Sequence, residues 1–496
     1  MALASLEQWQ EAKRSFRKGQ IKAPYDKRFP LELAGVAFKQ GNRSEARTLA
    51  RQALRLDPDD SYANDFLATL YFLSGNVEAA LKYWNRIGKP NIEEIRSDPH
   101  PRVNPVLLDR AFAAAPASLL QLDDFLRTRD RIGSLEIFSP YRLELDPRRD
   151  GKFDLVFRPH ERNGWGSTST ERMLHLARGI PYQTLHLEVF NLKRSAVNSI
   201  SLIRWDAEKR RAFTSLSGPL EGDPKWRFRI HLDGRRENWD LSQNIREVTL
   251  PATEFNLQKL EAGAELGSTN GRWEWSSAAE VSHRQFMNPP EQSTLFTDGL
   301  ALKYRFKVNG RILATPERRL TIAPFAAAEM AKIFAASGNT YSKIQGGLGW
   351  RWHARAQGDD YLMTGQFRAG KTAGKPPFDE LFNLGLDRDQ EFWFRGHPGT
   401  HNGKKGSGPL GRDYLLVNFE FDKEIYNNGI WRLSSGPFLD AGKVYDRRTS
   451  FGFEQWLCDA GIQAKIRILG ALTVVFLYGK DLRSGGNTFY FDTMNR

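Results

Sequence analysis

The chain has 496 residues, with 72 Lys and Arg against 59 Asp and Glu, for a formal net charge of +13. This length predicts two to four domains, unless one of them is a large barrel. The basic residues are spread along the whole chain, usually one or two at a time, so no compact phosphate-binding patch is visible and nucleic acid is not an expected partner. The single cysteine, Cys458, excludes an intrachain disulfide and any cysteine-built metal site.

No window of 18 consecutive apolar residues occurs, so no transmembrane helix is expected. A strand that crosses a membrane needs only about ten residues, with every second one apolar, and hydropathy averages do not detect that pattern. A membrane protein built from strands therefore stays open at this point.

Residues 1–90 are predicted to be helical and repetitive. Four pairs of positions are 34 residues apart: Leu33 and Leu67, Ala34 and Ala68, Gly41 and Gly75, Ala46 and Ala80. This is the tetratricopeptide (TPR) period, in which small residues let the two helices of a hairpin approach closely and the glycines make the turn. The stretch EQWQEAKRSF resembles the second helix of a repeat whose first helix is missing. We therefore expect an all-α TPR solenoid with an incomplete first repeat.

The first ten residues, MALASLEQWQ, have neither a basic n-region nor an apolar h-region, so no signal peptide is visible. Two interpretations stay open: a cytosolic protein, or a chain whose true start, with a signal peptide, has been removed or missed. The broken repeat favours the second.

Residues 91–162 have a different pattern of predicted secondary structure: a strand, two helical stretches and two alternating strands. The helices are expected around 107–112 and 119–126, and the strands LEIFSPYRLELDP and FDLVFRPHER are joined by the turn signal RRDG. This order gives a compact α+β unit that feeds straight into the next domain. It resembles a polypeptide-transport-associated (POTRA) domain.

Residues 163–496 contain no convincing helix-period segment longer than about ten residues. Alternating runs separated by turn-forming residues occupy 182–190, 198–205, 225–234, 271–281, 301–310, 343–355, 361–370, 414–421, 462–468, 471–479 and 487–491. A spacing near 20 over this region gives about 16 antiparallel strands. Trp residues near strand ends, Trp239 among them, fit an aromatic girdle, although an ordinary large antiparallel barrel would have them too.

Two motifs decide between these interpretations. The first lies in a strand and a long loop, 370–412, and comprises Gly365, Gly370, Pro377, Phe378, Glu380, Phe382 and Gly385, followed by Phe394, Arg395, Gly396 and His397. The second, GPFLDAGKVYD, comprises Phe438, Asp440 and Gly442. Their spacing resembles the arginine–glycine signature and the aromatic-x-Asp-x-Gly strand of the POTRA-barrel superfamily of outer-membrane insertases and translocases, the bacterial surface antigen or outer membrane protein assembly factor type.

The resemblance covers about residues 90–496. It implies a multi-domain protein with a TPR solenoid at 1–90, a single α+β POTRA domain at 91–162, and a 16-stranded antiparallel transmembrane β-barrel at 163–496. The loop 370–412 would fold inward, on the strand order that the family implies. One POTRA unit is fewer than a main insertase carries, and TPR repeats in front are not the common arrangement.

An arginine inside a barrel must find anions, and a carboxylate one strand away can accept its fork bidentately. We therefore predict an Arg395–Asp440 pair, with Gly396 either at positive φ or close to the wall, and with Phe394 and Trp393 wedging the tip. A loop arginine that merely lies in solvent is the competing interpretation. His397 stands where the family has an aromatic residue, which puts the packing of the tip in question.

No enzyme signature stands out. His160, His186 and His231 lack partners at metal-ligand spacing, and no Ser-His-acid set is visible. We therefore expect no enzyme activity, no catalytic residues, no metal and no cofactor.

The resemblance implies a factor that inserts polypeptides into the outer membrane of a diderm bacterium or exports them across it, through a barrel with a lateral seam between its first and last strands. The N-terminal domains would lie in the periplasm. Implied partners are unfolded or partly folded outer-membrane or secreted polypeptides, a possible periplasmic protein on the TPR units, and outer-membrane lipid. The alternatives are a passive outer-membrane channel or structural barrel with a periplasmic TPR partner-binding module, and a soluble TPR scaffold with a β-rich domain.

Overall fold

The structure is a computed structural model of the full chain. It describes residues 7–162, 164, 169–243, 253–290, 295–335, 338–354, 360–389, 392–446, 452–468 and 472–494. Part of the predicted loop, 390–391, and most of the junction at 163–168 lie outside these ranges. The chain divides into two compact units, one made of 1–100, 112–129 and 141–159 and the other of 101–111, 130–140 and 160–496.

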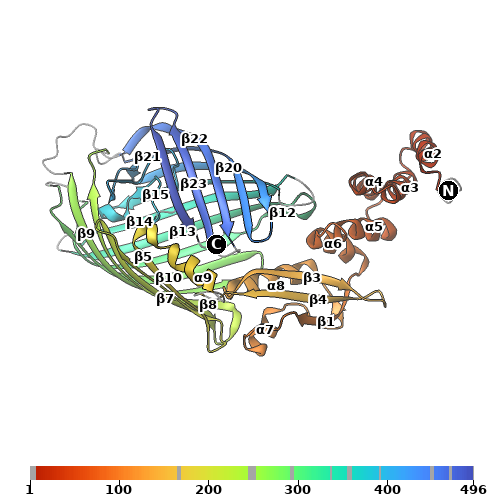
Figure 1. Ribbon diagram of the computed structural model, residues 1–496, viewed down its shortest axis with the longest axis horizontal. Coiled ribbons are helices and arrows are strands. Elements are labelled where there is room, and N and C mark those ends of the chain that lie inside the picture. The colour runs from red at the N-terminus through yellow and green to blue at the C-terminus, as the bar shows by residue number, and fades with distance from the viewer. Residues whose placement is uncertain are drawn as a thin grey trace. The chain divides into compact units, whose positions relative to one another are not determined.

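The first unit begins with helices in the predicted hairpin pattern (red in Figure 1). They are α2 (Trp9–Lys22), α3 (Arg28–Lys39), α4 (Arg43–Leu56), α5 (Ser61–Phe72) and α6 (Val77–Trp84), with the 3₁₀ turn η1 (Asn85–Ile87) after them. The side chains of Asn42, Asp60 and Asn76 each accept a hydrogen bond from the backbone N–H three residues on, which caps α4, α5 and α6. Gly41 and Gly75 adopt φ of 77° and 76° in the turns, a left-handed conformation that favours glycine.

The predicted packing positions of the repeats are buried between the helices. Leu33, Ala34, Ala46, Leu67, Ala68 and Ala80 are all at most 1% exposed. Lys27, at the start of α3, forms ion pairs with Asp57 and Asp60, and its hydrogen bonds to Asp57 and then Asp60 raise the pKa of Lys27 to about 12. Sequence periodicity therefore identified the repeat core, and polar contacts connect α3 to the start of α5.

The α+β region contains a four-stranded sheet in the order β2-β1-β4-β3. Its elements are β1 (Asn91–Ser97), α7 (Pro105–Ala111), β2 (Ser118–Leu119), α8 (Leu122–Ser134), β3 (Phe138–Pro147) and β4 (Phe153–Glu161). β1 pairs with β4 in parallel and with β2 in the antiparallel sense. The helix expected over 119–126 begins only at Leu122, because Ser118 and Leu119 extend to pair with β1.

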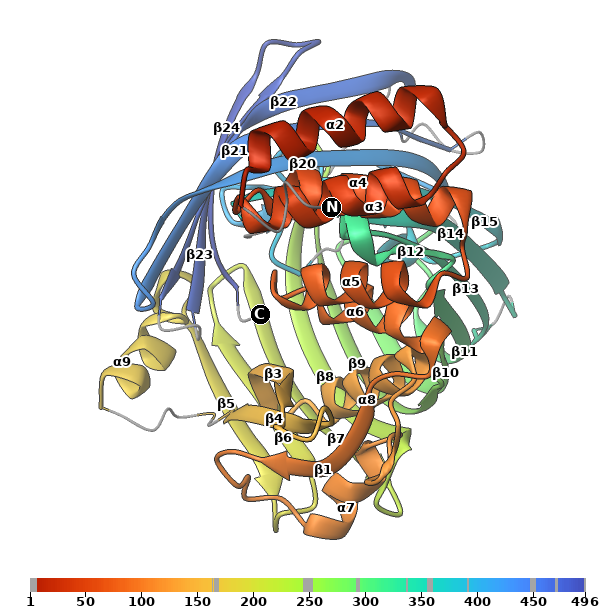
Figure 2. The same cartoon turned by 90° about the vertical axis from the view of Figure 1, so that its right-hand side faces the viewer.

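The second unit is dominated by a large antiparallel sheet whose strand order closes as a barrel (Figures 1 and 2, yellow β5 to blue β24). Its long strands are β5 (Thr184–Leu192), β6 (Val197–Trp205), β7 (Lys209–Leu220), β8 (Asp223–Asp240), β9 (Glu254–Thr269), β10 (Trp273–Met287), β11 (Gly299–Gly310), β13 (Leu320–Phe334), β14 (Thr340–His353), β15 (Tyr361–Gly374), β20 (Asp413–Asn427), β21 (Trp431–Tyr445), β22 (Gly452–Ile468), β23 (Leu472–Asp481) and β24 (Asn487–Met494). A short helix, α9 (Ser169–Ala177), and a 3₁₀ turn, η2 (Ile180–Tyr182), precede β5. Small elements in the connections are β12 (Leu313–Thr315) and η3 (Pro316–Arg318). Among the described residues, each helix is too short or too polar to span a membrane.

Within the described residues the wall therefore has fifteen long strands, and the predicted count of sixteen is not confirmed. Fourteen neighbouring pairs from β5 round to β24 are all antiparallel. An even number of antiparallel steps leaves β5 and β24 running in the same direction. Among the strands that the structure describes, the junction of first and last is thus unlike the other fourteen, and parallel pairing is slightly less stable per residue than antiparallel pairing.

The segment between β15 and β20 runs from 375 to 412, shorter than the predicted loop because β15 continues to Gly374. Its described residues, 375–389 and 392–412, form short elements: η4 (Phe378–Glu380), β16 (Phe382–Asn383), β17 (Thr400–His401), β18 (Lys404–Lys405) and β19 (Leu410–Gly411). We call this segment the lumen loop.

Candidate functional site

The lumen loop lies inside the barrel, because its residues contact strands from all round the wall. Ion pairs and hydrogen bonds connect it to β6 through Arg204, β8 through Glu237, β9 through Lys259, β10 through Arg284, β11 through Lys303, β14 through Lys343, β21 through Asp440, β22 through Asp459 and β24 through Thr488. A segment outside the wall could not reach opposite sides of it at once. The inward folding predicted for this loop is therefore the arrangement that the structure has.

The base of the lumen loop rests on an aromatic cluster. The Phe378 ring lies 5.1 Å from the rings of both Trp239 and Phe255, measured between centroids, and 5.3 Å from that of Phe296. Trp239 is only 6% exposed, so its expected place in an aromatic girdle is wrong. It faces inward, where its ring adds apolar area under the loop.

Glu380, two residues further on, is a buried anion among cations from four strands. Its carboxylate lies 2.9 Å from Lys343 Nζ, 3.2 Å from Lys259 Nζ, 3.4 Å from an Arg284 Nη and 3.6 Å from Lys303 Nζ. Together with Asp379, which lies 3.0 Å from Arg284 and 3.3 Å from Lys259, this carboxylate offsets repulsion between side chains on β9, β10, β11 and β14. The remaining base residues Pro377, Phe382 and Gly385 are also buried, and a Cβ on Gly385 would lie 3.1 Å from Gly399 Cα.

At the tip of the loop, Arg395 contacts the predicted partner Asp440 on β21. Its Nε and Nη2 donate to the two carboxylate oxygens of Asp440 at 2.8 and 2.6 Å, and its backbone N–H donates to the same carboxylate at 2.9 Å. Nη1 donates to Glu420 on β20 at 2.7 Å. Arg395 is 2% exposed and Asp440 0%, so the competing interpretation of a solvated loop arginine is wrong.

The other motif residues shape the space around this ion pair. The Arg395 guanidinium carbon lies 4.0 Å from the centre of the Phe438 ring, a cation–π distance. Phe394 is 0% exposed, and a Cβ at Gly442 would lie 3.4 Å from its ring. Gly442 thus lies against the ring of the aromatic residue that precedes Arg395, and the tightest contact of a Cβ there would be with the Leu415 carbonyl oxygen, at 3.0 Å.

Gly396 allows the loop to pass close to the wall, one of the two predicted roles, and its φ is not positive. A Cβ on Gly396 would lie 2.4 Å from the Asp459 carboxyl carbon, closer than any side chain tolerates, and the Gly396 N–H donates to the Asp459 carboxylate. The Gly396 carbonyl accepts from Thr488 on β24 at 2.8 Å. His397 packs its ring 4.9 Å from that of Phe394 and faces Asp459 and Asp481 on β22 and β23.

Sequence reasoning missed Glu420, Asp459 and Asp481. Glu420 lies within the alternating run 414–421, whereas Asp459 precedes the run 462–468 and Asp481 follows the run 471–479. Without the strand register, an inward-facing acid at any of these positions cannot be distinguished from a polar residue of an ordinary strand. The cross-strand pairs Asp440↔Asp459 and Asp459↔Asp481 put three aspartates side by side on the inner wall. That row is the surface on which the tip residues 395–397 lie.

Comparisons with known proteins agree with both parts of this description. Residues 3–70 match the family model of the tetratricopeptide repeat. No curated protein matches the sequence. Among solved structures, CdiB from Escherichia coli is similar with a TM-score of 0.52 and 13% identity, over 82% of this chain and 76% of that one.

Two further structures match with lower scores. BamA from Haemophilus ducreyi lacking POTRA domains 1–3 has a TM-score of 0.48 and 11% identity, over 82% of this chain and 84% of that one. CdiB from Acinetobacter baumannii has a TM-score of 0.47 and 10% identity, over 81% and 73%. At such identities a likeness concerns the fold alone. The likeness in fold rests on CdiB from Escherichia coli, whose TM-score is 0.52. The resemblance of this chain to the POTRA-barrel proteins, stated above from motifs, thus extends to the fold.

Proposed function

We propose that this protein is an outer-membrane protein assembly or translocation factor, which inserts or exports polypeptides through a β-barrel with a lateral seam. The barrel would lie in the outer membrane of a diderm bacterium, with the TPR units and a single POTRA domain in the periplasm. Incoming chains in extended form would pair with an exposed sheet edge. No chemical step is required of any side chain in this mechanism.

The observation that carries the proposal is the buried ion pair of Arg395 and Asp440. Burying two charges costs several kcal/mol per ion before their attraction offsets it, so such a pair is a poor device for stability alone. It does fix the tip of a long internal segment at one place on the wall. A passive channel gains nothing from a segment that fills its lumen, whereas a factor that handles polypeptides needs a controlled interior.

The junction of β5 and β24 supports a seam at that place. In lipid, each unpaired backbone group costs several kcal/mol, so a junction that opens must pass its hydrogen bonds to another strand. The lumen loop also reaches this junction: the Arg388 guanidinium lies 4.1 Å from the centre of the Tyr182 ring, just before β5, and donates to Thr493 Oγ1 on β24 at 3.2 Å. A rearrangement of the loop would therefore change the contacts that Arg388 makes on both sides of the seam.

Two experiments test the proposal in cells that depend on this protein. Arg395→Ala and Asp440→Ala should leave the barrel folded, as judged by heat-modifiable gel mobility, and should lower the yield of the folded or exported polypeptides that depend on it. Unchanged yields with both variants would sink the proposed role of the pair. Large, stable single-channel conductance in the wild-type protein would favour a passive channel instead.

The seam is tested by cysteine pairs, one in 182–191 and one in 487–493, in a Cys458→Ser background that removes the native thiol. Oxidation should block activity and reduction should restore it. The matched control is a pair that crosslinks β13 to β14, an ordinary antiparallel junction. If the seam-locked barrel works as well as the reduced one, lateral opening is not the mechanism.

A further inference from the structure

The row Asp440, Asp459 and Asp481 places three carboxylates next to one another on the inner wall, where they repel each other. Like charges directly opposite one another on neighbouring strands destabilise a sheet. Arg395 neutralises Asp440. Among the described residues, no lysine or arginine forms an ion pair with Asp459 or Asp481, and the side chain that both of them face is His397.

One oxygen in this cluster lacks a hydrogen-bond partner. Asp459 is 0% exposed, its Oδ2 receives the Gly396 N–H and faces His397 Nδ1, and its Oδ1 has no partner within the described part of the chain. A Cβ at Gly396 would lie 2.4 to 2.7 Å from the Asp459 carboxyl carbon and both of its oxygens, so the carboxylate lies directly against the loop tip. A buried carboxylate oxygen without a donor is costly, and it calls for a ligand.

The donor atoms are spaced as the ligands of a small cation are spaced. A histidine can offer only one ring nitrogen to a given ion, and one ligand atom from each of the three residues lies within 4.8 Å of the others. His397 Nδ1 lies 3.1 Å from Asp459 Oδ2. Tetrahedral zinc, with bonds of about 2.0–2.2 Å to nitrogen and oxygen, holds its ligands roughly 3.3 Å apart. We propose that His397, Asp459 and Asp481 form a binding site for a divalent transition-metal cation such as Zn²⁺.

The donor set favours this class of ion over Mg²⁺ or Ca²⁺, because imidazole suits zinc and its neighbours, and calcium takes six to eight oxygen ligands. Three protein ligands leave a fourth position for water. The cation would connect the loop tip to β22 and β23, next to the link that Arg395 makes with β21. The site depends only on the loop tip and the wall, and not on the proposed transport function.

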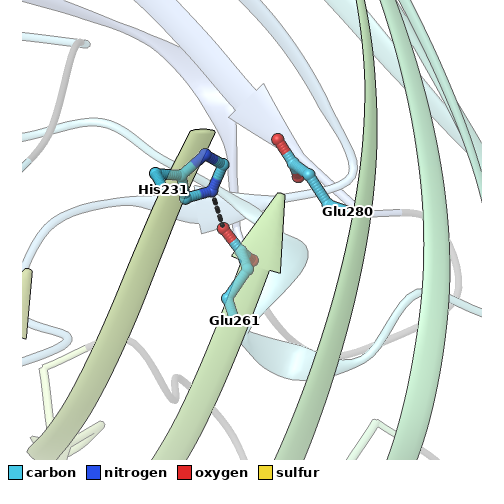
Figure 3. Close-up of side chains that lie close together, drawn as sticks. All are labelled: His231, Glu261 and Glu280. Atoms are coloured by element: carbon cyan, nitrogen blue, oxygen red, sulfur yellow. Dashed lines mark ion pairs between the residues drawn. The ribbon is translucent and has the colours of Figure 1, made fainter. Parts of the chain in front are cut away.

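A second histidine–carboxylate cluster supplies a control. His231 on β8, Glu261 on β9 and Glu280 on β10 lie close together (Figure 3), with His231 Nε2 3.5 Å from Glu261 Oε1, although the sequence predicted no partner for His231. Lysine and arginine side chains already neutralise both acids. Lys259 lies 3.2 Å from Glu261, Lys303 lies 3.0 Å from Glu280, and Arg305 lies 2.6 Å from Glu280. A dication there would face three positive charges, so we expect none to bind.

The test uses the purified full-length protein in detergent, stripped with a chelator and then titrated with ZnCl₂ by calorimetry. We expect a saturable site in the wild type and in His231→Phe, and its loss in His397→Phe and in Asp481→Asn. Zn²⁺ should raise the unfolding temperature of the wild type and of His231→Phe, and should leave the other two unchanged. Gel mobility checks that each variant is folded.

Asp481→Asn keeps the size and shape of the side chain, so it tests the site even if His397→Phe repacks the loop tip. Absence of a saturable site in the wild type would overturn the proposal. So would a site that survives both His397→Phe and Asp481→Asn, or one that His231→Phe removes. Because this readout is metal binding, its result is independent of any transport assay.

Discussion

Removal of the Arg395 side chain should release the tip of the lumen loop while the barrel stays closed around it. In Arg395→Ala the fully buried Asp440 loses its two short guanidinium bonds and Glu420 loses one, while Asn418 Nδ2, 2.7 Å from Asp440, remains. Breaking a buried ion pair by deleting one partner costs about 3–5 kcal/mol. At 1.4 kcal/mol per tenfold, the undocked state of the tip should gain roughly 10²- to 4 × 10³-fold in population.

Hydrogen exchange of the loop amides measures this population. The N–H groups of Gly385, Leu386 and Gly399 donate to carbonyls inside the loop at 3.0, 2.9 and 2.8 Å. Their exchange should accelerate in Arg395→Ala and in Asp440→Ala, and the double variant should add little because the partner is already gone. Amides in the middle of β14 serve as the internal control. If the three loop amides exchange at wild-type rates in both single variants, the ion pair does not hold the tip.

Three further predictions concern other contacts. Gly396→Ala should shift the tip away from the wall at a cost of about 1–3 kcal/mol, measured by the same exchange assay, while Gly349→Ala, whose Cβ meets nothing closer than 3.8 Å, should exchange like the wild type. Glu380→Ala removes the carboxylate that Lys259, Arg284, Lys303 and Lys343 share, and should expose the loop base to protease where Glu380→Gln has a smaller effect. Asp60→Ala removes the cap of α5 and should destabilise the helices around it by about 1 kcal/mol, seen as faster hydrogen exchange in α5. Asp59→Ala, at an exposed position, is the neutral comparison. Equal exchange rates in the two variants would contradict the capping role of Asp60.

The repeats were readable from sequence because they obey one local rule. Helix spacing, a small residue at each close approach and a glycine at each turn recur 34 residues apart, and none of these signals depends on distant parts of the chain. The Arg395–Asp440 contact was readable for a different reason. Two motifs at the right separation indicated which strand follows the loop, and an inward arginine needs an acid within reach.

β9 shows why the wall itself was harder to read. Phe255 and Leu257 are buried inward against the lumen loop, whereas Leu260 and Leu266 are 63% and 37% exposed on the other face. The apolar residues of this strand therefore change face part of the way along it, and the alternation that predicts a half-buried strand is broken. The sequence of this strand therefore shows no single alternating pattern along its whole length.

The row of aspartates at the candidate site was also hidden in the sequence, because it depends on how neighbouring strands are aligned. Asp440, Asp459 and Asp481 become neighbours through the registers of β21, β22 and β23, and a slip of one residue in any of these strands would turn its acid to the outer face. Periodicity cannot fix such a register, whereas the tip of the lumen loop can. Arg395 contacts Asp440, Gly396 contacts Asp459, and His397 contacts both Asp459 and Asp481, so the bound loop selects the register in which all three acids face inward. On this view the motif residues at the tip specify the alignment of the wall strands as well as the position of the loop, and variants that release the tip should loosen β21–β23 before they affect β6–β8.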